Sequence, residues 1–145
     1  MRRDLHFEMY YPHAPEKVWR ALTDRRAIER WLMPDDFEPR VGHRFRFVSK
    51  PTGGWDGIVN CEVLELEPNR RLVYTWKTNM LDTQVAFTLE PDGTGTRLRV
   101  DHTGFDGFRA WMVSLLMGGG WSKVMKQIGV VVGDDSWLVR ATNHP

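Results

Sequence analysis

The sequence predicts an α+β domain in which a curved antiparallel sheet of about six strands wraps around a long C-terminal helix. We expect two short helices to plug one end of the sheet. Two observations lead to this prediction: apolar residues follow strand period through the middle of the 145-residue chain, and helical period near both ends. Because a broad concave sheet is wider than a single helix, the arrangement favours a gap between them, which is the physical basis for expecting a pocket.

The N-terminal part of the chain is predicted to form a strand followed by two short helices. Alternating apolar residues over 5–11 indicate the strand. Pro15 suits the first turn of a helix, where its missing N–H is no loss, and residues 18–22 carry an apolar stripe at helical spacing. Asp24 is a candidate N-cap for the second helix, whose apolar stripe covers 27–32.

The middle of the chain is predicted to be an antiparallel meander. Short apolar stretches recur at a spacing of roughly ten residues, and clusters of Pro, Gly, Asn and Asp separate them. The cluster at 91–95, Pro-Asp-Gly-Thr-Gly, is a strong hairpin signal. The expected strands lie around 45–47, 58–66, 72–76, 85–89 and 98–102.

The C-terminal part returns to helical period in two apolar stripes, at 111–116 and 121–132. Three glycines, 118–120, lie between the stripes, and each glycine inside a helix costs about 1 kcal/mol relative to alanine. We therefore expect a break or kink there, with the final helix starting near Trp121. Residues 134–145 show no period, and we interpret them as an irregular tail of a single domain spanning 1–145.

Composition and charge exclude several classes of protein. Twenty Lys and Arg against nineteen Asp and Glu give a net charge of +1. This is too small to indicate a nucleic-acid-binding protein, which usually carries an excess of positive charge. Cys61 is the only cysteine, so an intramolecular disulfide is excluded. The first residues lack the apolar region of a secretory signal, and no apolar run is long enough to cross a bilayer. We therefore expect a cytoplasmic protein that contacts neither nucleic acid nor membrane.

The motifs of well-known catalytic centres are missing. The sequence has no Gly-x-Ser-x-Gly elbow, no phosphate-binding Gly-rich loop, no Gly-x-Gly-x-x-Gly and no His-Glu-x-x-His. The five histidines are scattered, without a partner ligand at helical spacing. We expect no metal site and no cofactor. Seven of the seventeen aromatic residues are tryptophan, a surplus that indicates either a large core or a pocket wall.

Three polar residues on predicted strands are candidates for a site. His102 shares a face with Leu98 and is expected to point inward, either as a ligand contact or acid–base group, or as a hydrogen-bonded structural histidine, which we favour. Asn60 and Glu62 share a face with Leu64. If that face is concave they orient a ligand in an apolar cavity, and if it is convex they are solvated; the pattern leaves both open.

Several sequence stretches together resemble the SRPBCC (Bet v 1-like, START-like) superfamily, and in particular its branch of homologues of the activator of Hsp90 ATPase. They are PEKVWRALTD at 15–24 with Trp31, FEPRVG at 37–42 with FRF at 45–47, VLELEPNRRLVYTW at 63–76, TRL at 96–98, HTGF at 102–105 and GW at 120–121. The resemblance implies the helix-grip fold. It implies little about function, because the superfamily includes lipid and hormone carriers, cyclases and co-chaperone domains.

The leading functional hypothesis is the binding of a small hydrophobic or aromatic molecule between the sheet and the C-terminal helix, without catalysis. One alternative is a cyclase- or hydrolase-like enzyme that uses His102 with Glu62 or Asn60. Another is a protein–protein role, as a homodimer or in a co-chaperone-like contact with Hsp90. The predicted ligand-binding residues are Trp31, Phe45, Phe47, Asn60, Glu62, Trp76, Val85, Phe87, His102, Trp111, Leu115, Trp121 and Met125.

Overall fold

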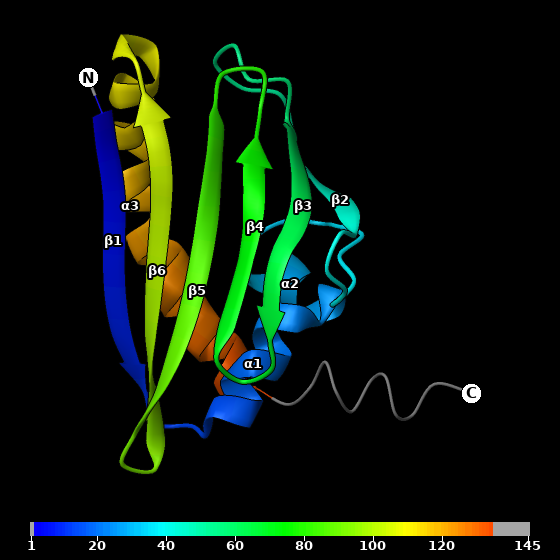
Figure 1. Ribbon diagram of the computed structural model, residues 1–145, viewed down its shortest axis with the longest axis vertical. Coiled ribbons are helices and arrows are strands. Elements are labelled where there is room, and N and C mark those ends of the chain that lie inside the picture. The colour runs from blue at the N-terminus through cyan, green and yellow to red at the C-terminus, as the bar shows by residue number, and fades with distance from the viewer. Residues whose placement is uncertain (1, 135–145) are drawn as a thin grey trace.

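The structure, a computed structural model, describes residues 2–134, with the side chains of 2, 3, 108–112 and 114–119 outside the description. This part of the chain forms six strands and three helices (Figure 1). The strands are β1 (Arg2–Tyr11), β2 (Arg44–Val48), β3 (Ile58–Glu67), β4 (Arg71–Lys77), β5 (Asp82–Asp92) and β6 (Gly95–Asp106). The helices are α1 (Pro15–Thr23), α2 (Arg25–Trp31) and α3 (Phe108–Gly133).

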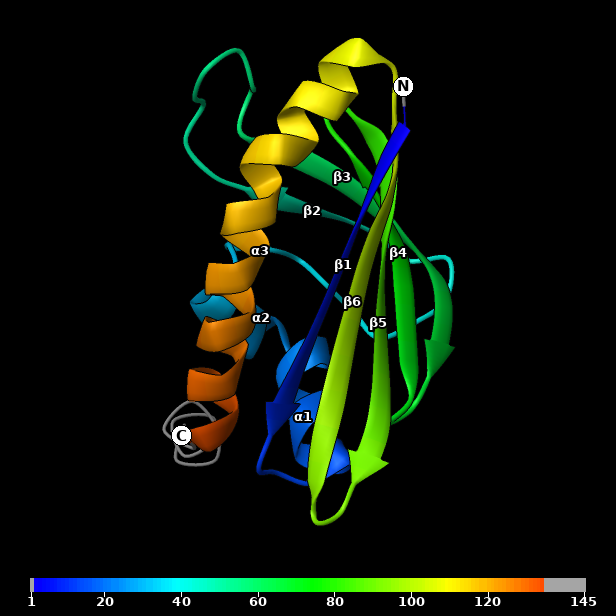
Figure 2. The same ribbon diagram turned by 90° about the vertical axis from the view of Figure 1, so that its left-hand side faces the viewer.

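The strands form one antiparallel sheet in the order β1-β6-β5-β4-β3-β2. Figure 2 shows α3 running along the concave face of the sheet, with α1 near one end. Contacts of α3 with β1, β6, α1 and α2 enclose the core. The predicted α+β architecture, a curved sheet gripping a C-terminal helix with two short helices at one end, is therefore confirmed.

Local sequence signals explain the short elements. Pro15 occupies the first turn of α1. The Asp24 carboxylate caps α2 by accepting a 2.9 Å hydrogen bond from the Arg26 N–H, as predicted for that position. Along β2, Phe45 and Phe47 are buried while the arginines between them are exposed, which is the alternation of a sheet with one covered face.

The third helix differs from the prediction of a break at the glycine run. It continues without interruption from Phe108 to Gly133. Tertiary packing overrides the low helix propensity of glycine, because buried side chains after the run, such as Met125 and Ile128, anchor the helix in the core. The Tyr11 hydroxyl adds a 2.6 Å hydrogen bond to the Met125 carbonyl, and Gly129 lets the tyrosine ring approach closely, since a Cβ there would lie 3.0 Å from it.

The segment after α2 closes the outer edge of β2. Asp35 pairs with Phe47 in an isolated bridge, and the Asp36 carboxylate accepts a 2.7 Å hydrogen bond from the Arg46 N–H. The Val48 N–H donates to the Pro34 carbonyl at 3.0 Å. These bonds satisfy backbone groups that would otherwise leave an open sheet edge. They also hold the end of α2 beside the sheet.

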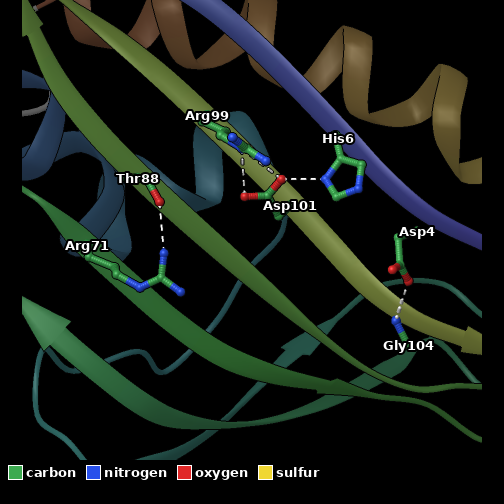
Figure 3. A network of polar contacts seen from close by, with 7 residues as sticks. All are labelled: Asp4, His6, Arg71, Thr88, Arg99, Asp101 and Gly104. Carbon is green, nitrogen blue, oxygen red and sulfur yellow. Dashed lines mark hydrogen bonds and ion pairs between the residues drawn. The ribbon is translucent and has the colours of Figure 1, made fainter.

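The outer face of the sheet is polar (Figure 3). Arg99 on β6 donates to the Asp101 carboxylate at 3.0 Å, and His6 on β1 contacts the same carboxylate. On the neighbouring strands, Arg71 donates to the Thr88 hydroxyl at 3.0 Å. Exposed pairs of this kind contribute little to stability, so we interpret this face as solvated. Across the described residues, no helix combines the length and apolar character needed to cross a membrane.

Candidate ligand-binding cavity

A cavity of about 310 Å³ lies between α3, the end of α2 and one end of the sheet. This volume falls in the usual range for small-molecule sites, and it is about twice the roughly 150 Å³ of an apolar cavity that holds benzene. The wall is formed by Leu32, Met33, Trp55, Val59, Trp76, Thr78, Met80, Leu81, Val113, Gly120, Trp121 and Val124. It therefore combines residues of α3, of the strands β3 and β4, and of the three segments that follow α2, precede β3 and follow β4.

The cavity wall is apolar and uncharged. Among the described lining residues there is no ionisable side chain, and Thr78 supplies the one hydroxyl. Trp76 and Trp121 form an aromatic corner, with ring centroids 6.1 Å apart, and two methionines add polarizable thioethers that favour contact with aromatic rings. Such a wall suits a neutral apolar molecule, because a buried charge without a partner is strongly unfavourable.

The three indole N–H groups of the wall differ in their partners. Trp55 donates to the Ile58 carbonyl at 3.0 Å, and Trp121 donates to Nδ1 of His102 at 2.9 Å. No acceptor lies within hydrogen-bond distance of the Trp76 N–H among the described residues. In that part of the chain, the one enclosed side-chain atom without a partner is Oδ2 of Asp35. Trp76 is buried and lines the cavity.

The Thr78 hydroxyl is held by the turn between β4 and β5. Its oxygen accepts hydrogen bonds from the N–H groups of Met80 and Leu81, both at 3.0 Å. The Leu81 carbonyl accepts a further bond from the Thr78 N–H at 2.9 Å. The hydroxyl proton has no acceptor among the described residues. Thr78 therefore retains a donor and no spare acceptor.

His102 stands behind the cavity wall and belongs to a chain of hydrogen bonds. Because an indole only donates, Nδ1 must accept from Trp121, and Nε2 must carry the proton. Nε2 then donates to the Thr83 hydroxyl at 2.8 Å, and that hydroxyl donates to the Trp76 carbonyl at 2.8 Å. The chain links α3 to β6, β5 and β4, and fixes the indole plane of Trp121.

The surroundings of His102 favour a structural function over acid–base chemistry. The side chain is fully buried, and burial lowers its pKa to about 3. Both ring nitrogens are occupied by Trp121 and Thr83. His102 does not line the cavity, although its partner Trp121 does. The imidazole thus remains neutral and orients the cavity wall from behind.

The predicted site residues fall into four groups. Trp76 and Trp121 line the cavity. Buried core positions that do not line it are Trp31, Phe45, Phe47, Val85, Phe87, His102 and Met125. Trp31, for example, donates its N–H to the Ala21 carbonyl at 2.9 Å and packs edge-on against Phe87. The side chains of Trp111 and Leu115 lie outside the described residues.

Asn60 and Glu62 form the fourth group, on the outer face of β3. The residues that alternate with them, Val59, Cys61 and Val63, are buried, whereas Asn60 is exposed and Glu62 pairs with Arg44 at 3.2 Å. The prediction that they enter the cavity is wrong. The prediction assumed that the face carrying the apolar Leu64 is the inner one, but Leu64 lies on the outer face and is 40% exposed. Since His102 faces inward, an enzyme that joins it to Glu62 or Asn60 is also contradicted.

Sequence reasoning missed most of the wall. The missed residues are Leu32, Met33, Trp55, Val59, Thr78, Met80, Leu81, Val113, Gly120 and Val124. Thr78 to Leu81 lie in a turn and Trp55 lies beside one, and apolar period gives no signal in such segments. Gly120 was interpreted as a helix break. One sequence signal for these wall residues was available: positions 113, 120 and 124 are seven and four residues apart, which places them on one face of a helix.

The half-buried Asp35 and the buried Cys61 also carry raised pKa values, and neither lines the cavity. Burial raises the pKa of Asp35 to about 6, and its Oδ1 accepts a 3.0 Å hydrogen bond from the Phe37 N–H. Burial, with the nearby charges of Asp35 and Asp36, raises the pKa of Cys61 well above its usual range. Cys61 is therefore a protonated, inert thiol rather than a nucleophile. No group of three or more metal-binding side chains occurs in the described part of the chain.

Comparison with known proteins adds to this geometry. The model of the family described as "Activator of Hsp90 ATPase homolog 1-like protein" matches residues 12–133. None of the curated proteins compared matches the chain. The crystal structure of a Mesorhizobium loti protein is 38% identical, with a TM-score of 0.81, and the match covers 90% of this chain and 97% of that one.

Two more distant solved structures share the fold alone. A protein of the dynemicin biosynthetic locus is 22% identical, with a TM-score of 0.72; the match covers 90% of this chain and 47% of that one. The Aha1 dimer from Colwellia psychrerythraea is 20% identical, with a TM-score of 0.73, and the match covers 90% of this chain and 96% of that one. Identities at this level establish the helix-grip architecture and leave function to the site.

Proposed function

The chain belongs to the family of activator of Hsp90 ATPase homolog 1-like proteins, and we propose that it binds a small hydrophobic or aromatic molecule in the cavity between α3 and the sheet. The observation that carries the proposal is the cavity itself, about 310 Å³ in volume with an apolar, uncharged wall. Neither a nucleophile nor an acid–base pair lies on the described wall, so binding without catalysis is the simplest activity consistent with it.

Two glycines of α3 support this proposal by contrast. At Gly129 a Cβ would lie 3.0 Å from the Tyr11 ring, so close packing explains the absence of a side chain. At Gly120 a Cβ would meet nothing within 4 Å. Gly120 lies on the helix face of Val113 and Val124, both of which line the cavity. Gly120 is exposed, and we infer that a glycine here, which costs helix stability and relieves no clash, leaves the cavity accessible.

The size of the cavity suggests the size of the ligand. A volume about twice that of a benzene-binding cavity suits two fused rings. Burying one aromatic ring contributes about 2–3 kcal/mol by area, and the cost of association offsets part of this. We therefore expect a bare two-ring probe such as naphthalene to bind with a Kd of roughly 10–100 µM, and the natural ligand to bind more tightly through polar contacts.

A titration with naphthalene, followed by tryptophan fluorescence and calorimetry, tests the proposal. Trp76 and Trp121 should respond because they form the wall. Gly120→Phe should fill the cavity and weaken binding by about tenfold or more, with the fold intact. Gly120→Ala is the matched control, since it removes the same glycine but leaves most of the volume. Binding that survives Gly120→Phe unchanged, or no binding by the wild-type chain, would rule the proposal out.

A protein–protein role is the second proposal, and the comparisons motivate it. The family description names an activator of Hsp90 ATPase, and one solved structure of the same fold is a dimer. Sedimentation velocity of the full chain tests homodimerisation, and stimulation of Hsp90 ATPase tests the co-chaperone contact. A monomer that leaves the ATPase rate unchanged would remove both versions, whereas ligand binding is independent of either result.

A further inference from the structure

The polar groups bordering the cavity are donors, and this asymmetry points to the chemistry of the ligand. Of the three indoles in the wall, Trp55 and Trp121 donate to protein acceptors, while the Trp76 N–H has no acceptor among the described residues. The Thr78 hydroxyl oxygen already accepts from two backbone N–H groups, so its remaining capacity is its proton. Both available side-chain groups can therefore give a hydrogen bond, and neither can receive one.

Trp76 and Thr78 are placed to act on the same part of a ligand. Trp76 lies near the end of β4 and Thr78 lies in the turn that follows it, and both residues line the cavity. The Trp76 side chain is only 5% exposed, so solvent offers little competition for its N–H. A carbonyl oxygen carries two lone pairs and can accept from two donors.

The rest of the wall restricts the ligand further. No lining side chain in the described part of the chain is ionisable, which disfavours a charged ligand. The methionine sulfurs at 33 and 80 accept only weakly, so an amine or amide N–H would lose its hydrogen bonds to water without replacement. The tryptophan and methionine surfaces favour a flat aromatic body.

We propose that the cavity selects a neutral, flat aromatic ketone or quinone of about two rings, whose carbonyl oxygen accepts hydrogen bonds from the Trp76 N–H and the Thr78 hydroxyl. This inference rests on the proposed binding function and names its ligand class. It makes Trp76 and Thr78 the residues that determine specificity, while Trp121 and the other apolar residues supply affinity. Trp76 was predicted from the sequence as a ligand contact, and Thr78 was not.

A matched pair of probes tests the inference on the full-length chain. 2-Acetylnaphthalene carries a carbonyl, and 2-isopropenylnaphthalene has the same shape with a CH₂ group in place of the oxygen. The wild-type chain should bind the ketone about threefold to tenfold more tightly than the hydrocarbon, as measured by calorimetry. The ratio of the two dissociation constants is the readout, because changes in packing affect both probes alike.

Variants then assign the preference to residues. Thr78→Val and Trp76→Phe should each move the ratio toward one, whereas Thr78→Ser, which keeps the hydroxyl, should retain it. A wild-type ratio of one overturns this inference and leaves the proposed function standing. A ratio that neither Thr78→Val nor Trp76→Phe changes also overturns it. If the wild-type chain binds neither probe, this inference and the proposed function fail together.

Discussion

Replacing His102 by leucine tests the hydrogen-bond chain behind the cavity wall. The substitution leaves the buried Trp121 N–H without its acceptor, which costs about 1–3 kcal/mol. It also removes ring contacts with Phe105 and Trp76, at centroid distances of 4.5 and 5.4 Å, worth about another 1 kcal/mol. We expect His102→Leu to lower the free energy of unfolding by about 2–4 kcal/mol in total, measured by equilibrium urea denaturation at pH 7.5.

A double-mutant cycle separates the hydrogen bond from packing. In a Trp121→Phe background there is no N–H to leave unpaired, so His102→Leu should cost about 1–3 kcal/mol less than in the wild type. If the two substitutions are additive within about 0.5 kcal/mol, the bond between these side chains contributes nothing and the reasoning is refuted.

The pH dependence of stability gives an independent check on His102. Its pKa is about 3 in the folded protein, against 6.5 for an ordinary histidine. Between these values the unfolded chain binds more protons, so this residue makes stability fall as pH decreases from about 6.5 toward 3. His102→Leu should remove this contribution. An unchanged acid slope in the variant would show that the imidazole is not neutral in the fold.

Three further predictions concern Gly129, Tyr11 and Asp35, which do not line the cavity. Gly129→Ala should destabilise the fold by about 1 kcal/mol, because the added methyl group meets the Tyr11 ring. Gly120→Ala meets no atom and should stabilise the fold by about 0.5–1 kcal/mol through its higher helix propensity. Equal effects of the two variants in urea denaturation would contradict this. Tyr11→Phe should cost about 1 kcal/mol by losing the bond to the Met125 carbonyl, and an unchanged urea midpoint would exclude that contribution. The pKa of Asp35 is about 6 when folded, against an ordinary 3.8, so the folded state binds more protons in that window and Asp35 lowers stability as pH rises through it. Asp35→Asn should abolish this term, and thermal melts from pH 4 to 7 with the wild-type slope would refute the assignment.

The fold was largely predictable from sequence because its signals are local. Each of three predictions depended on a few neighbouring residues: the alternation of apolar and polar residues in β2, the start of α1 at Pro15, and the N-cap of α2 at Asp24. Each of them was confirmed. The continuity of α3 was not predictable in this way. It depends on packing of residues such as Met125 against distant β1, and this outweighs the cost of three glycines.

The site was predictable only in part, because it depends on tertiary placement. Trp76 and Trp121 were identified because each lies on the apolar face of its element. Asn60 and Glu62 were misplaced because Leu64 puts an apolar residue on the outer face of β3, so the pattern alone does not tell the two faces apart. Thr78 gives no periodic signal at all, and its relevance emerges from the two backbone N–H groups that occupy its oxygen.

A crystal structure of the chain with 2-acetyl-6-bromonaphthalene tests the central claim most directly, because bromine gives an anomalous signal that locates the ligand without ambiguity. The ligand should lie between Trp76 and Trp121, with its carbonyl oxygen within hydrogen-bond distance of the Trp76 N–H or the Thr78 hydroxyl. An anomalous peak elsewhere on the molecule, or none at saturating ligand with the cavity filled by protein side chains, would contradict the account.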